Sequence, residues 1–154
     1  LTRSSAASDV YKRQRLMTEK PPGCVLLADR HHGLTEGVRG LLKTTFGTVV
    51  MVADEASLLD AAGRLRPEVA VVDLSLARDS GLGWLSAIRQ RCPGLKVIVL
   101  SVHDEQAVRR AAMEAGADAF VLKREIVTEL LNAVELVREV RSSSASTDGE
   151  GQDA

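Results

Sequence analysis

The sequence has few aromatic residues, only two cysteines and almost no net charge. Aromatic side chains make up 3% of the 154 residues, so a hydrophobic core must be built from aliphatic side chains. Cys24 and Cys92 cannot form the disulfide framework of a small secreted protein, and we expect buried free thiols in a reducing cytoplasm. The formal charge of −1 argues against a general attraction to nucleic acid or to anionic membranes.

Long apolar runs are missing as well. No run approaches the roughly 20 residues that a membrane-spanning helix needs, and the first residues lack both an initial Met and the apolar core of a signal peptide. We interpret residues 1–16 as a non-native or disordered leader and Met17 as the native start. Residues 141–154 are rich in Ser, Gly and Asp, so we expect a disordered tail or a truncated linker there. The folded domain is expected over residues 17–140.

Short apolar runs alternate with helical patterns through this domain. The last helix is expected to run from about residue 124 to Val140. Strands that alternate with helices through short loops predict a three-layer α/β fold with a doubly wound, five-stranded parallel sheet. A closed eight-stranded barrel would need about twice the length. The runs predict strands at residues 24–28, 48–53, 69–73, 96–101 and 119–122.

The stretch from Pro67 to Gly81 carries the first functional signal. Its apolar run stops at Asp73, at the carboxyl end of a strand that we expect to be buried on both faces. Sites in open parallel sheets are built at this edge, because the loops there vary freely while the strands hold them in place. A carboxylate at such a point serves as a metal ligand, a general base or a nucleophile.

Three more polar side chains stand at the ends of other strands. Asp29 follows the first strand, Ser101 ends the fourth and Lys123 follows the fifth. Each has an ordinary explanation by itself, such as Asp29 capping the first helix or Lys123 lying in solvent. Together with Asp73 they are the set that phosphoryl transfer to a carboxylate requires: a nucleophile, an acid for a divalent cation, a hydroxyl and an ammonium group. The sequence therefore favours Asp73 as a nucleophile.

Four segments carry a resemblance to a known family: VLLADRH, VVDLSL, VIVLSVHDE and GADAFVLKRE. Residues 24–140 resemble a response-regulator receiver domain, most closely those of nitrate-response and nitrogen-fixation regulators. The resemblance implies a flavodoxin-like fold with strand order 2-1-3-4-5. It also implies two-component signalling, in which the partner is a sensor histidine kinase or a phosphotransfer protein. The domain would then be a signalling phosphoacceptor, with at most self-catalysed phosphorylation and dephosphorylation.

The resemblance also implies roles for single residues. Asp73 matches the phosphoacceptor, and Asp29 matches one acid of the pair that binds Mg²⁺. Ser75 matches the position whose backbone carbonyl completes the metal shell. The remaining matches are Ser101 as the switch hydroxyl, Lys123 as the phosphate-binding lysine and Phe120 as the aromatic residue that rotates on activation.

Two positions depart from the family pattern. Arg30 stands where the family usually has a second acid, which is commonly the direct metal ligand. Either Arg30 pairs with Asp73 or a phosphoryl group, or it points into solvent while Asp29 and Asp73 bind Mg²⁺ more weakly. The first possibility leads to an alternative function, a phosphorylation-independent pseudo-receiver that acts as a protein-binding module. Ala77 replaces a frequent Pro, which loosens the loop without touching the chemistry.

Histidines lie near two of the strand ends. His31 and His32 adjoin the acid corner, but adjacent residues on a helix face different directions, so we do not expect a paired metal ligand. His103 either lines the path of the water that hydrolyses the acyl phosphate or is an ordinary residue at a helix start. A third candidate function, a flavodoxin-like cofactor domain, lacks a glycine loop to hold a phosphate.

The output of such a domain is less visible in the sequence. No basic helix is present to enter a DNA groove, so direct nucleic-acid binding by these residues is not predicted. Regulators of the class that the chain resembles usually continue into a helix-turn-helix domain. The chain is therefore expected to be either a single-domain regulator that acts through protein contacts or part of a longer protein. The family often dimerises through the first and fifth helices or the fourth-helix face, and a homodimer is one expectation.

Overall fold

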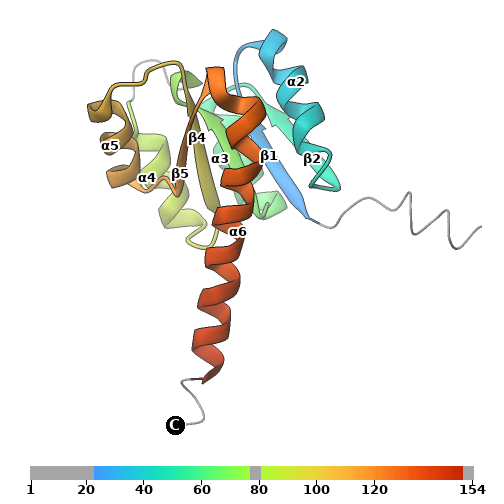
Figure 1. Cartoon of the computed structure of the whole chain (residues 1–154), viewed down its shortest axis with the longest axis vertical. Coiled ribbons are helices and arrows are strands. Elements are labelled where there is room, and N and C mark those ends of the chain that lie inside the picture. Colours follow the sequence, from blue (N-terminus) through green and yellow to red (C-terminus); the bar gives the residue numbers. More distant parts are fainter. Residues whose placement is uncertain (1–22, 77–80, 151–154) are drawn as a thin grey trace, which may run out of the picture.

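The computed structural model describes residues 23–76 and 81–150, and the side chains among them except those of residues 32–33 and 140–150. The leader 1–16, Met17 and Ala77 lie outside the described residues. The centre of the fold is a five-stranded parallel sheet with the order β2-β1-β3-β4-β5 (Figure 1). The strands are β1 (Cys24–Ala28), β2 (Thr48–Val52), β3 (Val69–Asp73), β4 (Lys96–Ser101) and β5 (Ala119–Leu122).

Helices cover both faces of the sheet, which confirms the predicted three-layer fold (Figure 1). One face packs against α2 and α6, and the other packs against α3, α4 and α5. Two short 3₁₀ turns, η1 (Leu74–Leu76) and η2 (Lys123–Glu125), follow β3 and β5 at the carboxyl edge of the sheet. The helices are α2 (His32–Leu42), α3 (Glu55–Leu65), α4 (Gly83–Arg91), α5 (Gln106–Ala115) and α6 (Ile126–Glu150).

The central strand β3 shows why the apolar runs form strands here. All five of its residues are buried, and successive side chains enter opposite cores because side chains alternate across a sheet. Val71 packs in the core under α2 and α6, and Val72 packs in the core under α3, α4 and α5. A continuous apolar run is therefore required, and a polar residue is tolerated only where the strand leaves the core, as at Asp73.

Two helix ends follow directly from the sequence. Asp54 precedes α3, and its carboxylate accepts a 2.7 Å hydrogen bond from the Ser57 N–H, which satisfies one of the free donors of the first turn. Gly116 follows α5 with a φ of 121°, a conformation that L side chains rarely adopt. Both residues therefore mark helix ends for which their side-chain types are suited.

Other details differ from the expectations. The last helix does not end near Val140 but continues to Glu150, and no glycine or proline interrupts residues 141–148 to stop it. The boundary at residue 141 between domain and tail therefore remains a prediction that the backbone does not mark. Cys24 and Cys92 are free, as expected, but they are only partly buried. Within the described part of the chain, no helix has the length and apolar character to cross a bilayer.

Candidate functional site

The carboxyl edge of the sheet brings the predicted polar residues into one region. Asp29 follows β1, Asp73 ends β3, Ser101 ends β4 and Lys123 begins η2 directly after β5. The register makes these ends level, because Asp73 pairs with Leu100 and Ser101 pairs with Leu122. The two acids and Ser101 are buried, while the Lys123 side chain keeps 12% of its surface exposed.

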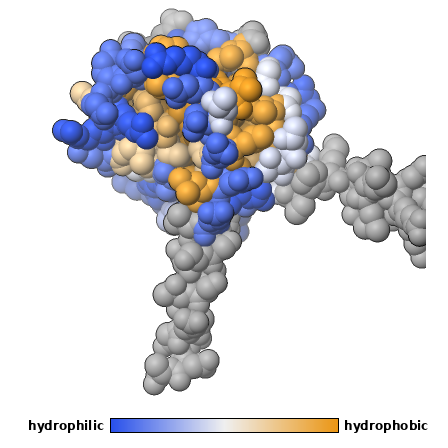
Figure 2. All heavy atoms as spheres, in the orientation of Figure 1, coloured by the Kyte–Doolittle hydropathy of each residue, from blue (hydrophilic) through white to orange (hydrophobic). Residues whose placement is uncertain are grey.

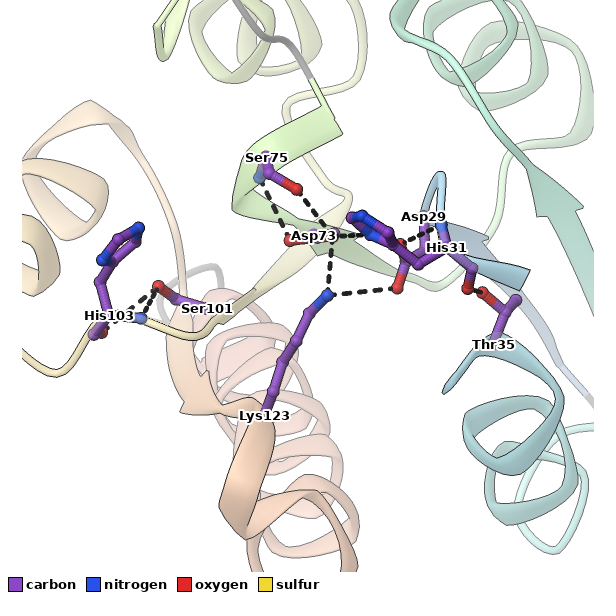
Figure 3. A network of polar contacts seen from close by, with 8 residues as sticks. All are labelled: Asp29, His31, Thr35, Asp73, Ser75, Ser101, His103 and Lys123. Atoms are coloured by element: carbon purple, nitrogen blue, oxygen red, sulfur yellow. Dashed lines mark hydrogen bonds and ion pairs between the residues drawn. The ribbon is translucent and has the colours of Figure 1, made fainter. Parts of the chain in front are cut away.

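Asp73 is the centre of the polar network at this edge (Figure 3). Its Oδ2 accepts hydrogen bonds from Lys123 Nζ at 2.8 Å and from the Ser75 hydroxyl at 2.9 Å. Its Oδ1 accepts a 3.1 Å hydrogen bond from the Ser75 N–H. The turn η1 sets both Ser75 contacts, because it folds the chain back over the end of β3. These hydrogen bonds hold the Asp73 carboxylate in one orientation, and the residue is only 2% exposed.

These contacts determine the charge of Asp73. Burial by itself raises the pKa of the carboxyl group, because it removes water from the charged form. The hydrogen bond and the positive charge of Lys123, together with the two hydrogen bonds of Ser75, outweigh burial and hold the pKa below its ordinary value. Asp73 is therefore an anion at neutral pH, which is the form that a nucleophilic carboxylate needs.

Asp29 shares the same cation but is less completely bonded. Its Oδ2 lies 3.5 Å from Lys123 Nζ, which is an ion-pair distance, and this buried oxygen has no hydrogen-bond partner. Its Oδ1 accepts a 2.8 Å hydrogen bond from the His31 N–H. Two buried carboxylates thus meet at one ammonium group. Such a set has oxygen ligands to spare for a hard divalent cation.

His31 reaches the same two acids. Its Nδ1 lies 3.2 Å from Asp29 Oδ1 and 3.5 Å from Asp73 Oδ2, and Asp29, His31 and Asp73 are close enough to share one metal ion (Figure 3). The expectation concerned a pair of histidines, and the side chain of His32 lies outside the described ones. The contact of His31 alone was missed, although the acid-x-histidine spacing after a buried strand could have signalled it.

Arg30 stands beside this network without joining it through an ion pair. It lines the cleft above Asp73, and its partly exposed side chain has a buried Nε without a hydrogen-bond partner. Among the described residues, no ion pair connects Arg30 to Asp29 or to Asp73. Lys123, and not Arg30, is the cation that contacts both acids. The pseudo-receiver hypothesis therefore lacks the contact that Arg30 would need to replace a metal ion.

Ser101 contacts the loop after β4 and makes no hydrogen bond to Asp73. The His103 N–H donates to its Oγ at 2.9 Å, and the Ser101 hydroxyl lies 3.3 Å from the His103 carbonyl oxygen. The His103 ring lies on the far side of Ser101 from Asp73, 3.8 Å from Glu105 (Figure 3). Phe120 is buried on β5, and the Arg109 guanidinium lies 5.9 Å from the centre of its ring.

A cleft of about 800 Å³ opens onto these residues. Its floor is polar, since it is formed by Asp73, Ser75 and Lys123, whereas apolar residues of α5 and the loop before α4 form part of its walls. Ser101 also lines it, so the hydroxyl and Asp73 face one space. The cleft can admit a phosphoryl donor to the Asp73 carboxylate, with an ammonium group and two hydroxyls available for phosphoryl oxygens.

The model of the response regulator receiver domain matches residues 25–135. The chain belongs to this family. The match covers the five strands, apart from Cys24 at the start of β1, and every residue of the network described above, so the resemblance in the sequence is confirmed. Receiver domains belong to two-component signalling, and the chain is a receiver domain of that kind.

Curated relatives include two nitrate/nitrite response regulators of Escherichia coli K12. NarP is 36% identical over 120 residues, which cover 77% of this chain and 56% of NarP. NarL is 31% identical over 124 residues, which cover 77% of this chain and 56% of NarL. The chain therefore spans little more than half the length of these relatives.

Solved structures show the same fold. The receiver domain of the putative response regulator NarL from Mycobacterium tuberculosis has a TM-score of 0.68 and 28% identity, covering 77% of this chain and 98% of its own. A response regulator from Burkholderia pseudomallei, solved with a phosphorylated aspartic acid, a calcium ion and citrate, has a TM-score of 0.65 and 26% identity, covering 81% of this chain and 74% of its own.

Proposed function

We propose that the domain accepts a phosphoryl group on Asp73 from the phosphohistidine of a sensor histidine kinase or of a phosphotransfer protein. A carboxylate oxygen of Asp73 attacks the phosphorus, the bond from phosphorus to the histidine nitrogen breaks, and that nitrogen takes up a proton. The products are an acyl phosphate on Asp73 and a neutral histidine on the donor. The network of Asp73 with Lys123 and Ser75 carries this proposal.

The neighbours of Asp73 have complementary tasks. Lys123 lies 2.8 Å from Asp73 and compensates negative charge as the phosphoryl oxygens arrive. The Ser75 N–H and hydroxyl hold the carboxylate in one orientation, which lowers the entropy cost of the attack. His103, whose ring is 60% exposed at the mouth of the cleft, is placed to influence the water that later hydrolyses the acyl phosphate.

A divalent cation such as Mg²⁺ fits the donor set at this edge. The buried Asp29 Oδ2 without a hydrogen-bond partner, the carboxylate of Asp73 and the backbone carbonyl of Ser75 are the oxygen ligands that we assign to it. When bound, the cation supplies positive charge that neutralises the crowded oxygens. The presence of a calcium ion and a phosphorylated aspartic acid in the Burkholderia pseudomallei regulator supports this assignment.

Ser101 and Phe120 transmit the change. In the unphosphorylated domain the Ser101 hydroxyl is bonded to the loop after β4, at His103. A phosphoryl group on Asp73 competes for this hydroxyl, because both lie at one cleft. Release of the loop shifts an existing equilibrium at the surface formed by α5, β5 and α6, where Phe120 is buried.

The partner surfaces follow from the same fold. Exposed Leu34 and Val127 flank a groove between α2 and the start of α6, where a second copy of the chain can bind. Figure 2 shows apolar atoms beside these two helices with hydrophilic atoms around them. We place the exchange with the kinase in the cytoplasm, since Cys24 and Cys92 are free thiols, and we assign no DNA contact or membrane contact to the described residues.

Intact-mass spectrometry tests the proposed function. The protein is incubated with Mg²⁺ and a small phosphodonor such as acetyl phosphate, and one phosphoryl increment is expected. Asp73→Asn removes the nucleophile while keeping the size of the side chain, so the increment should disappear. Glu36→Gln, which changes an exposed acid on α2, is the matched control and should keep it. Absence of any increment with several donors, or an increment that persists in Asp73→Asn, would overturn the proposal.

A further inference from the structure

We propose that His31 is a ligand of the cation site, and that it supplies a nitrogen donor where Arg30 has replaced the usual acid. The site then prefers first-row divalent cations that bind imidazole, such as Zn²⁺, over Mg²⁺. The inference deepens the proposed function, because it concerns the same two carboxylates. The position of the His31 ring and the Asp29 Oδ2 without a hydrogen-bond partner support it.

The distances between the donor atoms carry the argument. Bonds from a zinc ion to nitrogen or oxygen are about 2.0–2.2 Å long, so neighbouring ligand atoms around such an ion lie about 3–3.5 Å apart. His31 Nδ1 lies 3.2 Å from Asp29 Oδ1 and 3.5 Å from Asp73 Oδ2. The two distances from the nitrogen fit this spacing, and all three ligand atoms lie within 4.8 Å of one another, close enough to share one ion (Figure 3).

A second observation concerns Asp29. Its side chain is 1% exposed, and its Oδ2 has no hydrogen-bond partner. The ammonium group of Lys123 is its nearest cation at 3.5 Å, longer than the 2.8 Å that Lys123 makes with Asp73. A buried carboxylate oxygen without a hydrogen bond is costly, and a bound cation removes that cost. The oxygen belongs to the residue that already contacts the His31 ring through Oδ1.

The chemistry of the donors predicts the selectivity. Mg²⁺ prefers an all-oxygen shell and keeps several waters, so an imidazole adds little to its binding. Zn²⁺ and its neighbours in the first transition row accept carboxylate and imidazole together. Any nitrogen and oxygen site favours these ions to some degree, so the contribution of His31 must be measured as a change on substitution.

His103 provides a matched control within the same cleft. Its side chain is 60% exposed, as is that of His31, but its Nδ1 lies 3.8 Å from Glu105 rather than beside Asp29 and Asp73. Two single variants, His31→Ala and His103→Ala, therefore remove similar exposed rings and differ only in the contact with the acids. Neither side chain is part of a hydrophobic core, so both variants should fold.

Zinc titration of the whole chain, followed by ¹⁵N NMR of the histidine rings, tests the inference directly. The Nδ1 signal of His31 should move on addition of Zn²⁺, and the ring signals of His103 should stay in place. By calorimetry, His31→Ala should weaken Zn²⁺ binding about tenfold or more and change Mg²⁺ binding less than twofold. His103→Ala should change neither affinity.

The outcomes separate this inference from the proposed function. An unmoved His31 Nδ1 signal, or Zn²⁺ binding that His31→Ala leaves intact, would show that the ring is only a hydrogen-bond partner of Asp29 and would overturn the inference. The phosphodonor assay is then run on His31→Ala with Mg²⁺. A phosphoryl increment there leaves the proposed function standing, whereas its absence from the wild type with every cation tested would overturn that function and leave the zinc result valid.

Discussion

Charged side chains are well paired at the amino edge of the sheet and incompletely paired at its carboxyl edge. At the amino edge, the Arg89 guanidinium donates to the carbonyl oxygens of Gly116 at 2.8 Å and Leu95 at 2.6 Å, and it also pairs with Asp118. Asp118 in turn accepts the N–H of Val97 at 2.8 Å. At the carboxyl edge, two buried acids share one ammonium group and Asp29 Oδ2 has no hydrogen bond.

A second set of paired charges at the amino edge shows the same completeness of pairing. Arg138 on α6 makes two contacts with Glu68, at 2.8 and 3.3 Å, and its guanidinium lies 5.0 Å from the centre of the Phe46 ring. These charges stabilise the junctions between helices and strands, because each donor finds an acceptor. Incomplete pairing at the opposite edge leaves oxygen atoms available for a cation and a phosphoryl group. This difference is what we expect if the paired charges stabilise the fold and the incompletely paired ones take part in the proposed chemistry.

The largest effect is expected from breaking the amino-edge clamp, by which we mean the contacts of Arg89 with Gly116, Leu95 and Asp118. Arg89→Ala should lower the free energy of unfolding by about 2–4 kcal/mol, because Asp118 loses its closest cation and two carbonyl groups lose their donor. Chemical denaturation measures this change. The control is Arg64→Ala, which removes an exposed i,i+4 pair with Asp60 and should cost at most about 0.5 kcal/mol. Equal costs in the two variants would contradict the contrast between the edges.

A smaller effect is expected from adding the missing acid. Arg30→Asp should raise Mg²⁺ affinity about tenfold, because an oxygen ligand replaces a permanent cation beside the two acids. Calorimetric titration with Mg²⁺ measures the change. Arg30→Ala is the control, and it should give an intermediate affinity because it removes the cation without adding a ligand. Identical affinities in the wild type and Arg30→Asp would show that Arg30 has no influence on the site.

Neutralising Asp29 should raise the free energy of unfolding slightly, whereas breaking the amino-edge clamp lowers it. Asp29→Asn keeps the oxygen that accepts the His31 N–H but removes one of the two buried negative charges at Lys123. Without metal, we expect the free energy of unfolding to rise by up to about 1 kcal/mol. Denaturation in the presence of a chelator provides the measurement. A loss of stability as large as that of Arg89→Ala would show that the carboxyl edge is a structural clamp too.

The smallest effect is expected from pH. Because the pKa of Asp73 is lowered in the folded state, its carboxylate contributes stability that is fully present above the ordinary pKa and is lost as pH falls through the lowered value. The stability difference between the wild type and Asp73→Asn should therefore shrink below about pH 4. Asp29, His31 and Lys123 surround residue 73 in both proteins, so the comparison isolates the Asp73 carboxylate. A difference that grows on acidification would reverse the assigned sign.

The strands and the acids at their ends could be predicted from the sequence, whereas the finer contacts could not. An apolar run such as Val69 to Val72 has one stable environment, between two helical layers, and the acid that ends it must then stand at the edge. The backbone turns after β1 and β3 determine where His31 points and how the Ser75 hydroxyl reaches Asp73. Apart from the acid-x-histidine spacing after β1, local sequence patterns do not encode these turns.

Ion pairs between residues far apart in the chain could not be predicted from the sequence either. Arg89 and Asp118 lie on different elements, and nothing in either neighbourhood indicates their partnership. The sequence pattern predicts too early an end for α6, because a Ser-rich composition indicates a tail although no glycine or proline stops the helix over residues 141–148.

We infer that the incompletely paired carboxyl edge serves phosphoryl chemistry on Asp73. Borohydride reduction of the protein after treatment with a phosphodonor, followed by peptide sequencing in a mass spectrometer, tests it most directly, because an acyl phosphate of aspartate is reduced to homoserine. We expect homoserine in place of Asp73 and at no other acid, Asp29 included. Homoserine at another position, or a phosphorylated protein that contains none, would contradict it.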